Sequence, residues 1–178
     1  NVGFIHIADS PFLREVNLGK VEKTTSNFLS NTCFYYYKSI GLCNLPALEH
    51  LDLDLLDAMN PSGYSRGLYV GGIGLTALSL PSLTNAPGIW MSNNANLVSL
   101  SMNALGSIGA AGILLTNHSA LTTFSMTSLS EFPAGATTAI TIQTNAALDC
   151  ATDICPFKAQ LDAIPYPGTW AISPCTCL

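Results

Sequence analysis

Apolar residues recur along this chain in a nine-residue pattern in which positions 1, 4, 6 and 9 are apolar. The stretch "LVSLSMNAL", which begins at Leu97, is a typical copy. A helix would place apolar residues at i, i+3, i+4 and i+7, whereas positions 4 and 6 alternate with polar residues and therefore predict a short strand. Copies begin at Leu13, Leu48, Leu75, Leu97 and Leu121, and a degenerate copy begins at Leu148.

A second alternation precedes each copy. It is a triplet in which one apolar residue stands on each side of one outward residue. The third residue of this triplet lies six positions before the leucine of the following copy, except at Val70, where it lies five positions before. Both patterns have the period of a strand, so we predict an all-β fold with short strands joined by bends. The triplets are "IHI" at Ile5, "IGL" at Ile40, "LYV" at Leu68, "IWM" at Ile89, "ILL" at Ile113 and "ITI" at Ile140.

The repetition indicates a solenoid, because one coil cannot bury its own apolar face and stacked coils can. We predict a right-handed parallel β-solenoid of about six coils over residues 1–150, with a cysteine-rich cap over residues 151–178. A longer connection, about residues 23–38 ("KTTSNFLSNTCFYYYK"), forms an insert in the solenoid.

The bends carry a polar signal four residues before each pattern leucine. Short polar side chains at such bends can satisfy backbone groups of the turn and of the next coil, so we expect a ladder of the asparagine type. Asn117 also begins the only N-glycosylation sequon, "NHS", and a buried place in the ladder would make that sequon accidental. The bend residues are Asp9, Asn44, Gly71, Asn93, Asn117 and Thr144.

Charge is scarce and unevenly distributed. Hydrophobic residues make up 48% of the 178 residues and charged residues 10%, with a net charge of −5, which argues against a nucleic-acid partner. No apolar run approaches the roughly 18 residues of a membrane span. Between Arg66 and Glu131 lie 64 residues without any charge. Either another molecule covers that surface, or its hydroxyl and amide groups suffice to keep it hydrated.

Six cysteines favour an oxidising, extracellular or cell-surface location over a structural zinc site, because the spacing lacks paired C-x-x-C motifs. We expect Cys33 to pair with Cys43 and the other four to pair among themselves, as staples of the cap. Free thiols in a cytosolic protein are the alternative. The chain begins at Asn1 without an initiator methionine or a signal peptide, so we expect a processed or partial chain. The cysteines are Cys33, Cys43, Cys150, Cys155, Cys175 and Cys177.

The pattern "L-x-x-L-x-L-x-x-L" with its preceding "I-x-I" resembles leucine-rich-repeat solenoids. It is most similar to receptor L domains and related fungal and microbial cell-surface proteins, over roughly residues 4–150. The resemblance implies an extracellular protein that acts in recognition, adhesion or wall structure and that has no common catalytic residues or cofactor. The insert and the scarcity of charge depart from that family.

Catalytic motifs are absent from the sequence: it has no H-E-x-x-H, no G-x-S-x-G and no phosphate-binding glycine loop ahead of a helix. A β-helical carbohydrate-active enzyme would need converging carboxylates, and Asp52 and Asp54 lie on a face without an evident cleft. The outward positions Glu15, Asn17, His50, Asp52 and Asp54 form one expected acidic patch. Glu15, His50, Asp52 and Asp54 of that patch are a possible Ca²⁺ site, with an ordinary hydrated face as the alternative.

Farther along the same face the outward residues are neutral. Such a hydroxyl array could bind a polysaccharide, order water against ice or pack against another subunit. Regular threonine ranks would favour ice, and only one coil has two threonines at these outward positions. The possible ligand face comprises Ser99, Ser101, Asn103, Thr123, Ser125 and Thr127, after Ser79 in the preceding coil.

The outward residues of three successive triplets, Tyr69, Trp90 and Leu114, predict an apolar stripe on the other sheet. Exposed apolar area usually marks an interaction site, so we expect a protein–protein contact centred on Trp90. A loop that folds over the stripe and a sugar-stacking platform are the alternatives. The first coil, with Ile5, Ile7 and Leu13, has no cap in the sequence and is expected to pack on another polypeptide.

The sequence therefore predicts a non-enzymatic extracellular structural module without cofactors, which assembles with itself or with related chains. A recognition domain for a glycan or protein ligand is the alternative.

Overall fold

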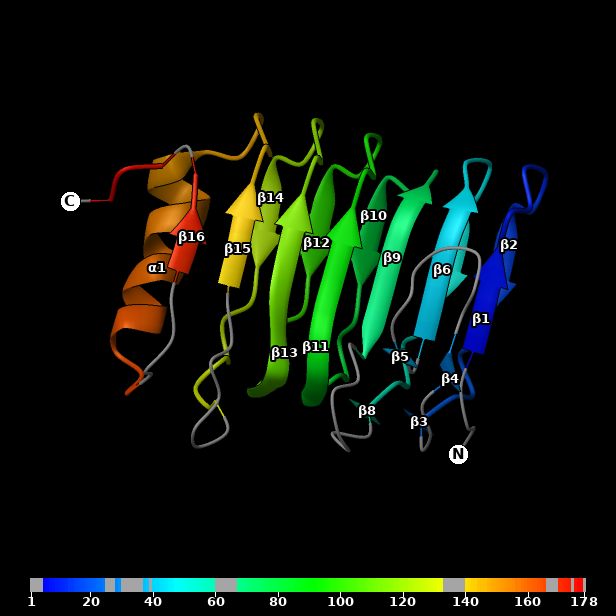
Figure 1. The fold of residues 1–178 in the computed structure, drawn as a ribbon, viewed down its shortest axis with the longest axis horizontal. Coiled ribbons are helices and arrows are strands. Elements are labelled where there is room, and N and C mark those ends of the chain that lie inside the picture. Colours follow the sequence, from blue (N-terminus) through cyan, green and yellow to red (C-terminus); the bar gives the residue numbers. More distant parts are fainter. Residues whose placement is uncertain are drawn as a thin grey trace.

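The computed structural model shows a parallel, solenoid-like all-β fold with one short α-helix at the C-terminal end (Figure 1). The structure describes residues 5–24, 28–29, 37–38, 40–59, 67–132, 140–165, 170–173 and 175–177. Most of the expected insert, with Cys33, lies outside these residues. No helix in the described part is long and apolar enough to cross a membrane.

The largest sheet contains the predicted triplets, and its strands lie side by side in the order β1-β6-β9-β11-β13-β15-β16 (Figure 1). Every pairing along this order is parallel. The strands are β1 (Ile5–Ala8), β6 (Ile40–Leu45), β9 (Leu68–Ile73), β11 (Asn85–Ser92), β13 (Ser107–Thr116), β15 (Ile140–Gln143) and β16 (Trp170–Ile172).

The nine-residue pattern supplies the short strands of the opposite face, which form two parallel groups. β10 (Ala77–Ser79), β12 (Ser99–Ser101) and β14 (Thr123–Ser125) form one group. The other group consists of β2 (Glu15–Asn17) and β7 (His50–Asp52). A third side is short: β3 (Lys23–Thr24) pairs with β8 (Ala58–Met59), and Asn85 at the start of β11 pairs with Ala58. A separate antiparallel pair joins β4 (Phe28–Leu29) and β5 (Tyr37–Lys38).

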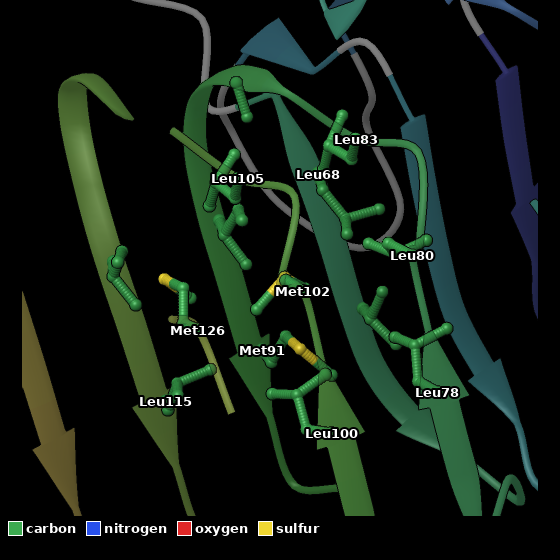
Figure 2. Packing of buried hydrophobic residues seen from close by; sticks show 14 of the residues in the cluster. Leu68, Leu78, Leu80, Leu83, Met91, Leu100, Met102, Leu105, Leu115 and Met126 are labelled. Atoms are coloured by element: carbon green, nitrogen blue, oxygen red, sulfur yellow. The ribbon is translucent and has the colours of Figure 1, made fainter. Parts of the chain in front are cut away.

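The core lies between the sheets and follows the predicted alternation. In the coil of the quoted stretch, positions 1, 4, 6 and 9 are all buried, and the same positions stack from coil to coil because the pairing register is preserved. Figure 2 shows this packing, with Leu78, Leu100 and Met102 in the same buried cluster as Met91 and Leu115 of the large sheet. The inward residues of the coil are Leu97, Leu100, Met102 and Leu105.

The polar bend residues adopt left-handed backbone conformations, which asparagine and aspartate tolerate better than most residues. Asn44 Nδ2 donates to Asp9 Oδ1 at 2.8 Å, and Asn117 Nδ2 donates to Asn93 Oδ1 at 3.0 Å, so neighbouring bends are linked. In the third coil, the prediction of Gly71 as the bend residue is wrong by one position. The residue that follows Asn44 in the stack of bends is Gly72, with φ 64°. The bend residues with positive φ are Asp9, Asn44, Gly72, Asn93, Asn117 and Thr144.

The C-terminal end is capped by a helical segment and two disulfides. The π-helical turn η1 (Cys150–Ile154) leads into α1 (Cys155–Asp162), and Asp149 accepts hydrogen bonds from the first turn. Phe157 packs edge to face on Phe124 of the last short strand, with ring centroids 5.0 Å apart. Gln160 Nε2 donates to the carbonyls of Thr127 and Leu129, which would otherwise form an open edge.

The cap cysteines pair among themselves, as the sequence predicts: Cys150 with Cys175, and Cys155 with Cys177. Cys43 is also disulfide-bonded, whereas Cys33, its expected partner, lies outside the described residues.

Candidate functional site

The N-terminal end of the solenoid differs from the capped C-terminal end. Among the described residues, β1, β2 and β3 each pair with one strand only, so three sheet edges end together. Val16 is buried, but the other inward apolar residues of this coil are only partly buried, whereas their counterparts one coil later, such as Ile40, Leu42 and Leu48, are fully buried. The partly buried residues are Ile5, Ile7, Leu13, Leu18 and Val21.

Among the described residues, no second strand pairs with the outer edge of β1. Asp9 N donates to Cys43 O of β6 at 3.2 Å, and because strand residues alternate, the N–H of Ala8 points away from β6. β1 reads "IHIA", without lysine, proline or any charge. By contrast, Glu15 lies on β2 and Lys23 on β3. Phe12, in the following bend, is 89% exposed. Packing of this coil on another polypeptide stays a prediction.

The structure places the residues of the predicted stripe next to one another on paired strands. Trp90 pairs in register with Tyr69 and with Leu114, and Thr141 follows Leu114. The prediction that Tyr69 is exposed is wrong, because this residue is only 4% exposed. The Tyr69 ring lies against Gly71 of its own strand, and its hydroxyl is 3.1 Å from Ser92 Oγ. Tyr69 is therefore not available to a partner.

Trp90 and Leu114 are half-buried and border a hollow of about 170 Å³ together with Ala111, Ile113 and Thr141. Trp90 Nε1 donates to Ala111 O at 2.9 Å. The indole therefore holds the neighbouring strand segment in addition to presenting apolar surface. An interface role for Trp90 and Leu114 remains a prediction.

The hydroxyl face is brought together as one array. Ser99 pairs in register with Thr123, and Ser101 with Ser125. Asn103 Oδ1 accepts from Ser125 Oγ at 2.6 Å and from both the backbone N–H and the hydroxyl of Thr127. The array is thus fixed by its own hydrogen bonds, and its binding of a ligand stays a prediction.

The predicted Ca²⁺ site is not formed. The register does place Glu15 beside His50 and Asn17 beside Asp52. However, the described residues contain no group of three or more His, Cys, Asp and Glu side chains that could hold a metal ion. Asp52 Oδ1 accepts the backbone N–H of Asp54, and Asn17 Oδ1 accepts that of Gly19, so these side chains stabilise their own turns.

A buried polar ladder, which sequence analysis missed, lies one residue after the exposed bends. Asn94 and Asn145 each accept a backbone N–H of the preceding coil and donate to a carbonyl, of Val70 and Leu115 respectively. His118 is the rung between them, and all three are buried. The signal was present, because each lies three residues before a pattern leucine in successive coils.

Only one of the two ring nitrogens of His118 is hydrogen-bonded within the described residues. Nδ1 accepts the backbone N–H of Asn94 at 3.3 Å, so the neutral ring carries its proton on Nε2, which has no hydrogen-bond partner among the described residues. Burial lowers the pKa of His118 to about 4, and the backbone of Met91 and Asn94 offsets this shift only in part. The histidine is therefore neutral at physiological pH.

Asn117 belongs to the bend ladder and yet is exposed, so the expectation that a ladder position would bury it is wrong. A glycan would replace one hydrogen of Nδ2, and the other could still donate to Asn93.

We expect chain secreted from eukaryotic cells to carry a glycan at Asn117. Ser119→Ala should abolish this modification, because it destroys the sequon, whereas the matched variant Ser119→Thr should retain it. Intact-mass spectrometry before and after enzymatic deglycosylation measures this. An unmodified wild-type chain from such cells would show that the sequon is not used.

Comparison of the chain with protein-family models, curated proteins and solved structures found no match.

Proposed function

We propose that this protein is a non-enzymatic extracellular structural module that assembles with copies of itself or with related chains. The observation that carries the proposal is the N-terminal end, where, in the described part of the chain, β1, β2 and β3 each pair with one strand only and lie beside partly buried core residues. An unprotected edge favours addition of another strand, and burial of Ile5, Ile7 and Leu13 would add hydrophobic stabilisation.

Further features support this proposal. The solenoid is taken as right-handed and leucine-rich-repeat-like, in keeping with the resemblance to receptor L domains. Disulfides favour an oxidising, extracellular location. The long neutral segment and the half-buried Trp90 and Leu114 supply a side surface on which charge does not oppose association.

Ala8→Pro should weaken self-association at least tenfold, which corresponds to about 1.4 kcal/mol. Proline removes the outward N–H of β1 and blocks an approaching strand, while the bonds of β1 to β6 remain. Analytical ultracentrifugation and light scattering over a concentration series measure the effect, and negative-stain imaging shows whether filaments form.

The matched control is Ala146→Pro. Ala146 is an exposed bend residue two positions before a pattern leucine, where Pro11 and Pro46 stand in earlier coils, so the fold accommodates proline there. This control should associate like the wild type. A wild-type protein that stays monomeric up to the highest soluble concentration would refute the assembly proposal.

A further inference from the structure

A cavity of about 550 Å³ opens on the third side of the solenoid. Its described lining combines an apolar floor, one aromatic ring and three polar side chains. This volume is in the range of small-molecule sites, which are mostly apolar with a few polar groups that orient the ligand. The lining residues are Asn85, Ala86, Ser107, Ile108, Gly109, Glu131 and Phe132.

The polar side chains come from successive rungs of one parallel ladder. Asn85 pairs in register with Ser107, and Ser107 with Glu131. Adjacent parallel strands are about 4.8 Å apart, so an amide, a hydroxyl and a carboxylate follow one another at that interval. Hydroxyl groups on opposite sides of a pyranose ring are separated by a similar distance.

These groups have hydrogen-bonding capacity to spare. Asn85 Nδ2 donates to Thr84 Oγ1 at 3.3 Å, which leaves its carbonyl oxygen as an acceptor. The Ser107 hydroxyl and the Glu131 carboxylate have no partner in the part of the chain that the structure describes. All three can therefore accept hydrogen bonds from a polyhydroxylated or amino-bearing ligand.

A bulge in β13 forms one wall of the cavity. Between the pairs Ala86–Ile108 and Gly88–Gly112, β11 has one residue and β13 has three. A Cβ at Gly109 would meet Pro87 backbone atoms at 2.8–2.9 Å, so only glycine permits this approach. Trp90 holds the far side of the same bulge through Ala111 O. The wall is thus fixed from both sides, as is common for bulges beside functional sites.

Glu131 is the only charged residue between positions 67 and 148, and it lies at this cavity. The adjacent Phe132 is half-buried and packs against the core, so its ring is held in place. An aromatic ring next to amide, hydroxyl and carboxylate acceptors matches a sugar, which has an apolar C–H face and a rim of polar donors.

We propose that this cavity binds one sugar unit of a glycan, with Phe132 against its C–H face and Asn85, Ser107 and Glu131 accepting hydrogen bonds from its hydroxyl or amino groups. This site does not depend on self-assembly, because it lies on the third side of the coils and not at their N-terminal end.

Isothermal titration calorimetry with three tetrasaccharides tests the proposal: a glucose, an N-acetylglucosamine and a glucosamine oligomer. We expect saturable binding in at least one arm, at least tenfold weaker for Glu131→Gln and for Phe132→Leu. Binding confined to the glucosamine arm would identify an ammonium group as the partner of Glu131, whereas binding of a neutral arm would identify hydroxyl donors.

The matched control is Asp54→Asn, which neutralises an exposed carboxylate on another face and should bind like the wild type. Melting temperatures show whether each variant is folded, and Glu131→Gln decides the matter if Phe132→Leu unfolds the protein. The proposal is overturned if no arm binds, or if Glu131→Gln binds as tightly as the wild type.

Discussion

Removal of the Cys150–Cys175 disulfide as a Cys150→Ser/Cys175→Ser variant is expected to lower the free energy of unfolding by about 3 kcal/mol. The bridge closes a segment with a sequence separation of 25 residues, and its loss restores conformational freedom to the unfolded chain. It also releases the tail from the helical cap, in which Phe157 and Leu161 are buried.

Denaturant unfolding of the wild type and the variant measures this loss, and amide hydrogen exchange should show reduced protection over α1. The control is Thr176→Ser, which changes an exposed residue between two bridging cysteines and should leave the midpoint unchanged. Coincident unfolding curves for the wild type and the cysteine variant would show that this bridge does not stabilise the cap.

His118→Asn is expected to stabilise the protein and to remove much of its sensitivity to mild acid. In the folded state the pKa of His118 is about 4, against an ordinary value of 6.5. The unfolded chain therefore binds more protons between these values, so the stability present above pH 6.5 is lost as the pH falls toward 4. The loss amounts to about 3 kcal/mol at most.

The variant should also gain stability above pH 6.5. Asn94 and Asn145 each donate to the carbonyl of the last residue of the triplet one coil earlier. For residue 118, the residue at that place is Met91. An asparagine amide can donate to Met91 O, whereas the neutral imidazole uses Nδ1 to accept from Asn94. One such hydrogen bond contributes about 1 kcal/mol.

Chemical denaturation at intervals from pH 4 to 7 compares the slopes of stability against pH. His50→Asn is the matched control, because it removes an exposed histidine and should leave the wild-type slope unchanged. Asp149, whose pKa is lowered by hydrogen bonds from Thr152 and Ala151, loses its contribution at more acidic pH and is common to all three proteins. Equal slopes for the wild type and His118→Asn would refute the assignment.

The inward half of the fold was predictable from the sequence. In a strand, side chains alternate strictly between two faces, so Leu100 and Met102 had to share one side once the segment was extended. The spacing between triplet and leucine, which is constant except at Val70, then aligned the coils, because a one-residue slip would expose the apolar set. The four cap cysteines could be grouped because they are close in sequence.

The outward half was decided by tertiary structure, because alternation gives the direction of a side chain and not what it meets there. Tyr69 points outward as predicted, yet it lies over Gly71 and bonds to Ser92. Asp52 shares a face with Glu15, yet it accepts a hydrogen bond from its own turn.

Groups contributed by neighbouring coils decided the remaining features. His118 accepts a hydrogen bond from a backbone N–H of the coil before it, and the Glu131 cavity is bordered by extra residues of β13 that the spacing of the sequence pattern does not reveal. The sequence determined which residues face the core because strand geometry has a fixed period. Only the tertiary structure decided which outward groups are satisfied, since hydrogen bonds and cavities arise between coils distant in sequence.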